Sequence, residues 1–252
     1  MNSPDPMNEM EVFMKFPVNG TNPSYHHSFG ITENWIIFHE QPLSYSVPRV
    51  LVGQFLWKGI LSSFYEDNSK KSVFHVINKT TGLKLKTKYS AKGMFCFHHI
   101  NAYETRGEDG NTFLVVDMCC SDQSPLWLFN TDNLRAEGKE IENWNFNLDR
   151  KKLVRPRRYV IPLDIPSDAS QGSNLVTIRG YKATAILCVD GSVSLEHELL
   201  IPDDIAGTNA AIELPRINYD YNNGRKYNYM YGVQGANFLP DQLVKINVEK
   251  KE

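Results

Sequence analysis

Histidine is the residue type whose placement first suggests chemistry, because an imidazole can act as a general base near neutral pH and is a common metal ligand. Seven histidines occur, and four of them form two adjacent pairs, His26-His27 and His98-His99. Neighbouring side chains of a strand point to opposite faces, so each pair would direct one imidazole inward. Neither pair fits the spacing of a zinc finger or of an HExxH helix. For the two pairs, a metal site and a purely structural, hydrogen-bonded role are equally compatible with the sequence. The other three histidines are expected to be structural: His39, His75 and His197.

No motif typical of nucleophilic catalysis or of phosphate binding occurs in the sequence. The G-x-S-x-G turn that exposes a catalytic serine is absent, and the scattered glycines form no phosphate-binding loop. Cys119-Cys120 lies at the end of a predicted strand and is expected to be reduced and structural. Four cysteines at irregular spacing indicate a reducing compartment rather than a disulfide scaffold.

The composition narrows the class of protein. The 252 residues carry 27 basic and 29 acidic side chains, and the pI is near 6.4, which excludes a general nucleic-acid binder with a basic face. A hydrophobic share of 41% excludes intrinsic disorder. Neither a transmembrane helix of ~20 apolar residues nor a signal peptide is predicted. One local basic run is expected to be a solvated loop leading into a strand, with contact to anionic lipid as the alternative: Arg150-Lys151-Lys152, Arg155, Arg157 and Arg158.

Strands must position these residues, because short runs rich in Val, Ile, Tyr and Phe recur between turn signals. Three hairpins are predicted, and they pair residues 73–78 with 83–90, 95–104 with 112–119, and 184–189 with 192–196. Further strands are predicted at residues 158–165, 213–218, 226–231 and 243–248. No alternation of strand and helix appears, so the chain is predicted to be all-β, as a sandwich, barrel or propeller.

One apolar stretch interrupts the strand pattern. Apolar residues recur at three- and four-residue spacing between residues 50 and 64, with Lys58 the one charge among them after Arg49. This pattern favours a helix or irregular insert that covers the end of the β-structure. The alternative is a patch that dips into a membrane surface, a boundary that Trp, Phe and Leu favour. The patch would consist of Val50, Leu51, Phe55, Leu56 and Trp57.

Four long segments stand out in the sequence: NPSYHHSFGITENWIIFHEQPL (residues 22–43), FHHINAYE (97–104), RRYVIPLDI (157–165) and IELPRINYDYNNGRKYNYMYG (212–232). These segments resemble the carotenoid cleavage oxygenase family of animals. The motifs are long and specific, and the resemblance extends from about residue 12 to the C-terminus.

This resemblance implies a seven-bladed β-propeller with a ferrous iron on its axis, held by four histidines. Matched by motif, His27 of the HSFG segment and His98, the first histidine of HHIN, are two of those ligands. Glu213 matches a carboxylate that accepts the free N–H of a ligand histidine, and His26 and His99 receive no metal role. The implied activity is cleavage of a carotenoid C=C bond with O2 to give retinal or apocarotenals. An apolar insert near residues 47–65 would contact a peripheral membrane surface.

The length departs from that of the family, whose members are about twice as long. The chain is therefore expected to be one partial propeller domain over residues 1–252, with roughly the central four blades and two of the four iron ligands. The alternatives are a retinyl ester isomerohydrolase and a truncated product without catalysis. The expected partners are a carotenoid or retinoid, O2 and a membrane surface, without nucleic acid. The expected location is the cytoplasm, peripherally on membranes, with the mitochondrion as the alternative.

Overall fold

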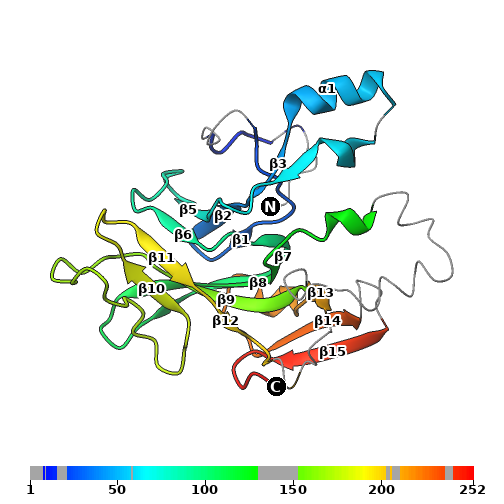
Figure 1. Ribbon diagram of the computed structural model, residues 1–252. Helices are drawn as coiled ribbons and strands as arrows, with labels where there is room; N and C mark the ends of the chain where they lie inside the picture. The colour runs from blue at the N-terminus through cyan, green and yellow to red at the C-terminus, as the bar shows by residue number, and fades with distance from the viewer. Residues whose placement is uncertain are drawn as a thin grey trace.

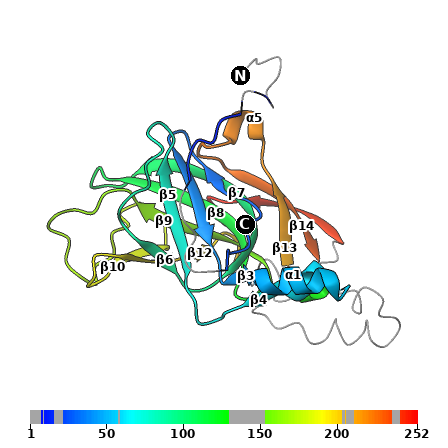
Figure 2. The ribbon, with the colours of Figure 1, turned by 90° about the horizontal axis from the view of Figure 1, so that it is seen from above.

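The chain is built mostly of β-strands, as predicted from the sequence. The computed structural model describes residues 8, 10–15, 22–57, 59–129, 153–202, 205, 211–235 and 241–252. Within these residues the strands form four sheets, of six, four, three and two strands (Figures 1 and 2). The helical elements described there are α1 (Val47–Phe55), α5 (Tyr219–Asn222) and the short 3-10 turns η1 (Ile60–Ser63) and η2 (Leu126–Phe129), and Ile205 is also helical.

The two larger sheets each join strands that follow one another in sequence with strands that do not, whereas the two smaller sheets join consecutive strands. The six-stranded sheet has the order β1 (Gly30–Ile31), β2 (Trp35–Glu40), β5 (Ser72–Asn78), β6 (Tyr89–Ala91), β11 (Val193–Glu196) and β10 (Thr184–Leu187). The four-stranded sheet has the order β12 (Glu198–Leu199), β9 (Arg155–Pro162), β8 (Thr112–Ser121) and β7 (Phe95–Arg106). The smaller sheets are β13 (Ala211–Arg216), β14 (Tyr229–Gly235) and β15 (Gln242–Asn247), and β3 (Leu43–Tyr45) with β4 (Phe64–Glu66). All these pairings are antiparallel except that of β6 with β11.

The four-stranded sheet lies between the six-stranded and three-stranded sheets, as the burial of both faces of β8 shows. Its residues from Phe113 to Ser121 are all buried, so both of its faces are covered. Leu114 and Val116 belong to the core shared with the six-stranded sheet, whereas Val115 and Cys119 belong to the core shared with the three-stranded sheet. This alternation follows from the two-residue period of a strand. The run of apolar residues in β8 therefore packs against two neighbours.

Two of the three predicted hairpins are confirmed. The strands β7 and β8 pair from Phe95↔Ser121 to Arg106↔Thr112, and β10 pairs with β11 across a turn in which Gly191 has φ +75°. The remaining prediction began too early, because of residues 83–90 only Tyr89 and Ser90 lie in a strand, β6 (Tyr89–Ala91). Before β6, one isolated bridge, Ile77↔Lys84, holds the segment to β5.

The prediction of a solvated loop for the basic run was wrong for its last three arginines. Arg155, Arg157 and Arg158 lie inside β9 and are buried, and Arg158 is fully inaccessible. The rest of the run, residues 150–152, lies outside the described residues. A fully buried guanidinium needs a counter-charge, because an isolated charge is very costly to remove from water.

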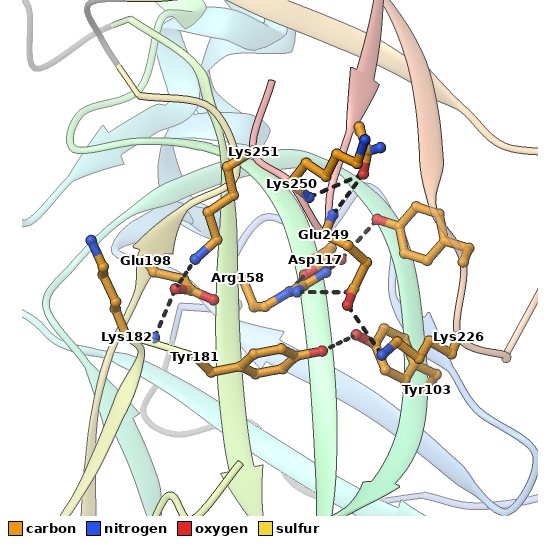
Figure 3. A network of polar contacts seen from close by, with 12 residues as sticks. Tyr103, Asp117, Arg158, Tyr181, Lys182, Glu198, Lys226, Glu249, Lys250 and Lys251 are labelled. Carbon is orange, nitrogen blue, oxygen red and sulfur yellow. Dashed lines mark hydrogen bonds and ion pairs between the residues drawn. The ribbon is translucent and has the colours of Figure 1, made fainter. Parts of the chain in front are cut away.

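Asp117 supplies that counter-charge from the next strand. Asp117 and Arg158 are directly opposite in the register of β8 and β9. The Arg158 Nε and Nη2 groups donate to the two Asp117 carboxylate oxygens at 2.8 and 2.9 Å (Figure 3). The Tyr227 hydroxyl donates to Asp117 Oδ2 at 2.7 Å, and Glu249 Oε1 lies 3.4 Å from Arg158 Nη1. This network joins the four-stranded sheet to the loop before β14 and to the C-terminal turn.

The apolar stretch after β3 forms a helix, as the residue spacing predicted. The helix α1 begins with Pro48 in its first turn and ends at Phe55, and η1 follows it. It stands at the edge of the molecule with the β3–β4 hairpin (Figures 1 and 2). Its apolar side chains are largely exposed, up to 85% at Phe55, and the following Trp57 is 96% exposed. Among the described helices, none has the length and apolarity needed to cross a membrane.

Candidate functional site

The structure brings His27 and His98 together, although they are far apart in the sequence. His98 lies in β7, and His27 lies in a bend between the Ser24↔Ser44 bridge and β1. The expectation that both pairs sit in strands was therefore wrong for His26-His27. The imidazole centroids of His27 and His98 are 4.9 Å apart and their planes are perpendicular. Two rings at this separation can present nitrogens to one shared ligand.

Glu213 holds the His98 ring in place. The His98 Nδ1 lies 2.6 Å from Glu213 Oε2, and Glu213 is buried in β13. Because a carboxylate only accepts hydrogen bonds, Nδ1 carries the hydrogen, and the Nε2 lone pair remains for a ligand. Glu213 Oε1 is also buried and has no hydrogen-bond partner within the described residues.

The backbone of β13 is bent at this point. Leu214 has φ +52°, in the left-handed region that is costly for a residue with a side chain. Its N–H donates to Glu213 Oε2 at 2.7 Å, and the β13–β14 register shifts between Glu213 and Arg216. The second bond anchors the carboxylate that holds His98. The available signal in the sequence was Pro215 directly after Leu214, because a proline inside a strand is typical of a bulge or an edge strand.

Tyr25 is a neighbour of His27 that the sequence reasoning missed. The Tyr25 hydroxyl and His27 Nδ1 are 2.9 Å apart. When Nδ1 donates this bond, His27 has the same tautomer as His98, with its Nε2 lone pair free. Partial desolvation and the His98 ring lower the pKa of His27, which favours the neutral imidazole that binds metals. A tyrosine two residues before the histidine was the available signal.

The other members of the histidine pairs lie in a separate group with His39. The rings of His39 and His99 are 5.1 Å apart, and the Ser28 hydroxyl lies 3.0 Å from His99 Nδ1. Burial, with a smaller effect from His98, lowers the pKa of His99 to about 3, and burial lowers the pKa of His39 well below its usual value. These histidines stay uncharged near neutral pH.

A cavity of about 390 Å³ opens beside His27 and His98. Glu213 also lines it, and the rest of its wall is mostly apolar. The apolar side chains come from four segments, Phe97, Phe129, Leu214 and Val233. A cavity with two imidazoles and one carboxylate in an apolar wall suits an apolar ligand held beside a metal.

The side chains beside the cavity supply only part of a metal-binding site. His98 has a fixed tautomer, His27 has a lowered pKa, and both face the same cavity. Within the described residues, however, no group of three or more His, Cys, Asp or Glu side chains could surround a metal ion. The described residues therefore offer two neutral imidazoles, and the remaining donors of a complete metal site must come from elsewhere.

Solved structures with the same fold define the class of protein first. Cobalt-substituted ACO from Synechocystis has a TM-score of 0.60 at 18% identity, covering 91% of this chain and 37% of its own. A variant of Synechocystis apocarotenoid oxygenase matches with the same TM-score, identity and coverage. The described strands thus have the fold of an apocarotenoid oxygenase over most of this chain.

Sequence comparison then gives the family. The chain matches the Retinal pigment epithelial membrane protein family over residues 3–252. It is 34% identical to "Carotenoid-cleaving dioxygenase, mitochondrial" of Macaca fascicularis, over 93% of this chain and 41% of the relative. The protein of the same name from Homo sapiens is 34% identical over 91% of this chain and 38% of its own length. The chain belongs to this family of carotenoid-oxygenase relatives, and it spans about two fifths of the length of the curated members it matches.

Proposed function

We propose that this chain provides one side of the active site of an iron(II)-dependent carotenoid dioxygenase. The observation that carries the proposal is the pair of imidazoles, His27 and His98, at 4.9 Å beside an apolar cavity, with Glu213 fixing the tautomer of His98. Neutral imidazoles leave a ferrous ion its full charge and open positions. When bound, iron of this kind supplies the redox chemistry that lets dioxygen react with an electron-rich polyene.

The protein residues would orient and enclose the substrate. Phe97 and Phe129 form part of the apolar wall, on which a polyene can pack without losing hydrogen bonds. Glu213 holds one ligand ring, and Tyr25 contacts the other. The names of the relatives support carotenoid as the substrate class and O2 as the second substrate. The bond that is cleaved, and whether the products are retinal or apocarotenals, depend on how the polyene lies in the cavity.

The same proposal includes the propeller fold and the cellular location of the protein. The three stacked sheets and the fold of the solved relatives support a place for this chain within a seven-bladed propeller. The two histidine ligands that complete the proposed site would then come from residues outside those described. The mitochondrial names of the relatives support a mitochondrial location.

Product analysis tests this function. The protein is loaded anaerobically with Fe2+, mixed with β-carotene in detergent and exposed to O2. Aldehyde products that depend on both Fe2+ and O2 are expected from a polypeptide of the relatives' full length that contains this sequence. The 252-residue chain alone is expected to give no turnover, because its described residues supply two donors. Conversion of an all-trans retinyl ester to cis-retinol without carotenoid cleavage would instead indicate an isomerohydrolase.

We propose further that α1 and the residues after it contact a membrane surface. Leu51, Phe55, Leu56 and Trp57 are between 58% and 96% exposed, and Val50 is half-buried beside them. Exposed large apolar side chains grouped on one projecting helix are typical of an interfacial contact. A carotenoid dissolved in lipid would reach the protein from such a surface.

Liposome flotation measures this contact. Replacing Leu51, Phe55 and Trp57 together with serine is expected to weaken binding to phosphatidylcholine vesicles by more than about tenfold, because three apolar side chains that would enter the bilayer are lost. A matched control replaces three exposed apolar residues elsewhere, Leu83, Val189 and Leu243, with serine. Equal vesicle binding by the two triple variants would refute the assignment of the patch.

A further inference from the structure

A second cavity, of about 600 Å³, lies on the six-stranded sheet between β5 and the segment that leads into β6. None of its lining residues lines the cavity beside His27 and His98. β5 and β6 lie on the opposite side of the molecule from β13 and β14, which contribute part of the wall of the cavity beside His98 (Figures 1 and 2). Any ligand of this cavity would therefore bind apart from the proposed active site.

A bulge in the sheet opens this cavity. Ile77 bridges Lys84, and Phe74 pairs with Tyr89. Between these two contacts, residues 75 and 76 of β5 are opposed by the longer stretch of residues 85–88, which bends at residues 86 and 87. The Leu85 N–H still donates to the Val76 carbonyl at 2.8 Å, so the extra residues are 86–88, which bend away from β5 and leave a concave surface.

Lysines dominate the charge of the cavity. Lys71, Lys84, Lys86 and Lys88 line it together with a single carboxylate, Asp190, which gives a formal charge of +3. The Ser192 backbone N–H and hydroxyl both donate to Asp190 Oδ1, at 3.0 and 2.6 Å, and the carboxylate also interacts electrostatically with Lys88, so it offsets one of the four positive charges. The lining residues thus carry three more positive than negative formal charges.

One lysine is held against the wall of the cavity. Lys84 Nζ lies 3.4 Å from His75 Nδ1, and His75 Nε2 lies 3.0 Å from Glu40 Oε1. The carboxylate fixes the hydrogen of His75 on Nε2, so Nδ1 can accept from the ammonium group. This chain of contacts positions one cation, and Lys86 and Lys88 follow it on the same segment.

We propose that this cavity binds a phosphate-bearing anion. Several ammonium groups around a concavity concentrate the positive potential, and lysine binds phosphate oxygens as a point charge. The hydroxyls of Thr87, Ser90 and Ser192 line the same cavity and can donate further hydrogen bonds. The volume admits more than a single inorganic ion. The phosphate could belong to a small soluble compound or to the headgroup of a lipid.

The first test uses inorganic pyrophosphate and isothermal titration calorimetry on the 252-residue chain. Lys86→Glu with Lys88→Glu changes the formal charge of the cavity from +3 to −1 and is expected to weaken pyrophosphate binding by at least about tenfold. The matched control, Arg179→Glu with Lys182→Glu, makes the same change in net charge at exposed residues outside the cavity, and it is expected to bind as the wild type does. The wild-type affinity should also fall as salt is raised from low to physiological concentration.

The second test distinguishes the two sources of phosphate. Flotation with phosphatidylcholine vesicles that contain phosphatidic acid is compared for the same three proteins. Loss of vesicle binding in the Lys86/Lys88 variant alone, without pyrophosphate binding by the wild type, assigns the site to a lipid headgroup. Pyrophosphate binding that only this variant loses assigns it to a soluble compound. The proposal is overturned if the wild type binds neither probe, or if the Lys86/Lys88 variant binds as the wild type does. If that variant does not fold, Lys86→Gln with Lys88→Gln takes its place, with a smaller expected loss.

Discussion

Asp117→Ala is expected to lower the free energy of unfolding by about 3–5 kcal/mol, because it leaves the charge of Arg158 buried without its partner. Both side chains have no exposed surface, and two short hydrogen bonds join them. The change also removes the acceptor of the Tyr227 hydroxyl. Burial, together with the Asp117 carboxylate, raises the pKa of Tyr227 well above its usual value, so that hydroxyl remains a donor that needs an acceptor. Urea denaturation followed by circular dichroism measures the loss.

A control and a double variant show whether the cause is the unpaired charge. The exposed pair of Lys250 and Glu252, at 3.7 Å, lies in the C-terminal turn that borders the same network. Lys250→Ala is expected to change the free energy of unfolding by less than about 1 kcal/mol, because water screens an exposed pair. Asp117→Leu combined with Arg158→Met removes both charges and is expected to be less destabilising than Asp117→Ala. If the double variant is the more destabilised of the two, burial of an unpaired charge is not the reason for the loss.

The buried arginine also shows where reasoning from the sequence ends. A run of basic residues normally indicates a solvated segment, and residues 150–152 gave no reason to expect otherwise. Arg158 is buried because β9 places it opposite Asp117, from a strand more than thirty residues earlier in the chain. Such a pairing depends on strand register, which a single sequence does not specify. The hairpin of β7 and β8, in contrast, was predictable, because its turn lies within a local glycine-containing segment.

Part of the candidate site was likewise predictable from the sequence and part was not. His27, His98 and Glu213 were singled out by the resemblance of long motifs, and in the structure His98 Nδ1 lies 2.6 Å from Glu213 Oε2. Tyr25 and the bent backbone at Leu214 were not predicted. Their roles arise from side-chain direction and from a strand irregularity, and neither property has a periodic signal in the sequence.

Replacing His98 with alanine is expected to abolish specific Co2+ binding by the 252-residue chain, whereas Glu213→Gln should weaken it by about 10–100-fold. The first change removes one of two imidazoles that face the cavity. The second keeps a carbonyl oxygen near His98 Nδ1 but removes the negative charge that raises the basicity of the ring. Cobalt replaces iron because its visible absorption reports ligand number directly, and it requires neither substrate nor O2.

The controls separate loss of a ligand from loss of the fold. His197→Ala removes a half-buried histidine that packs on Tyr159, away from the cavity, and should leave Co2+ affinity unchanged. The urea midpoint of Glu213→Gln should differ from that of the wild type by no more than the midpoint of His197→Ala does. A Co2+ affinity that is equal in the wild type and in the His98→Ala protein would exclude His98 as a ligand. An unchanged affinity in Glu213→Gln alone would instead mean that the 2.6 Å contact positions the His98 ring without tuning its basicity, because the glutamine oxygen can still accept the Nδ1 hydrogen.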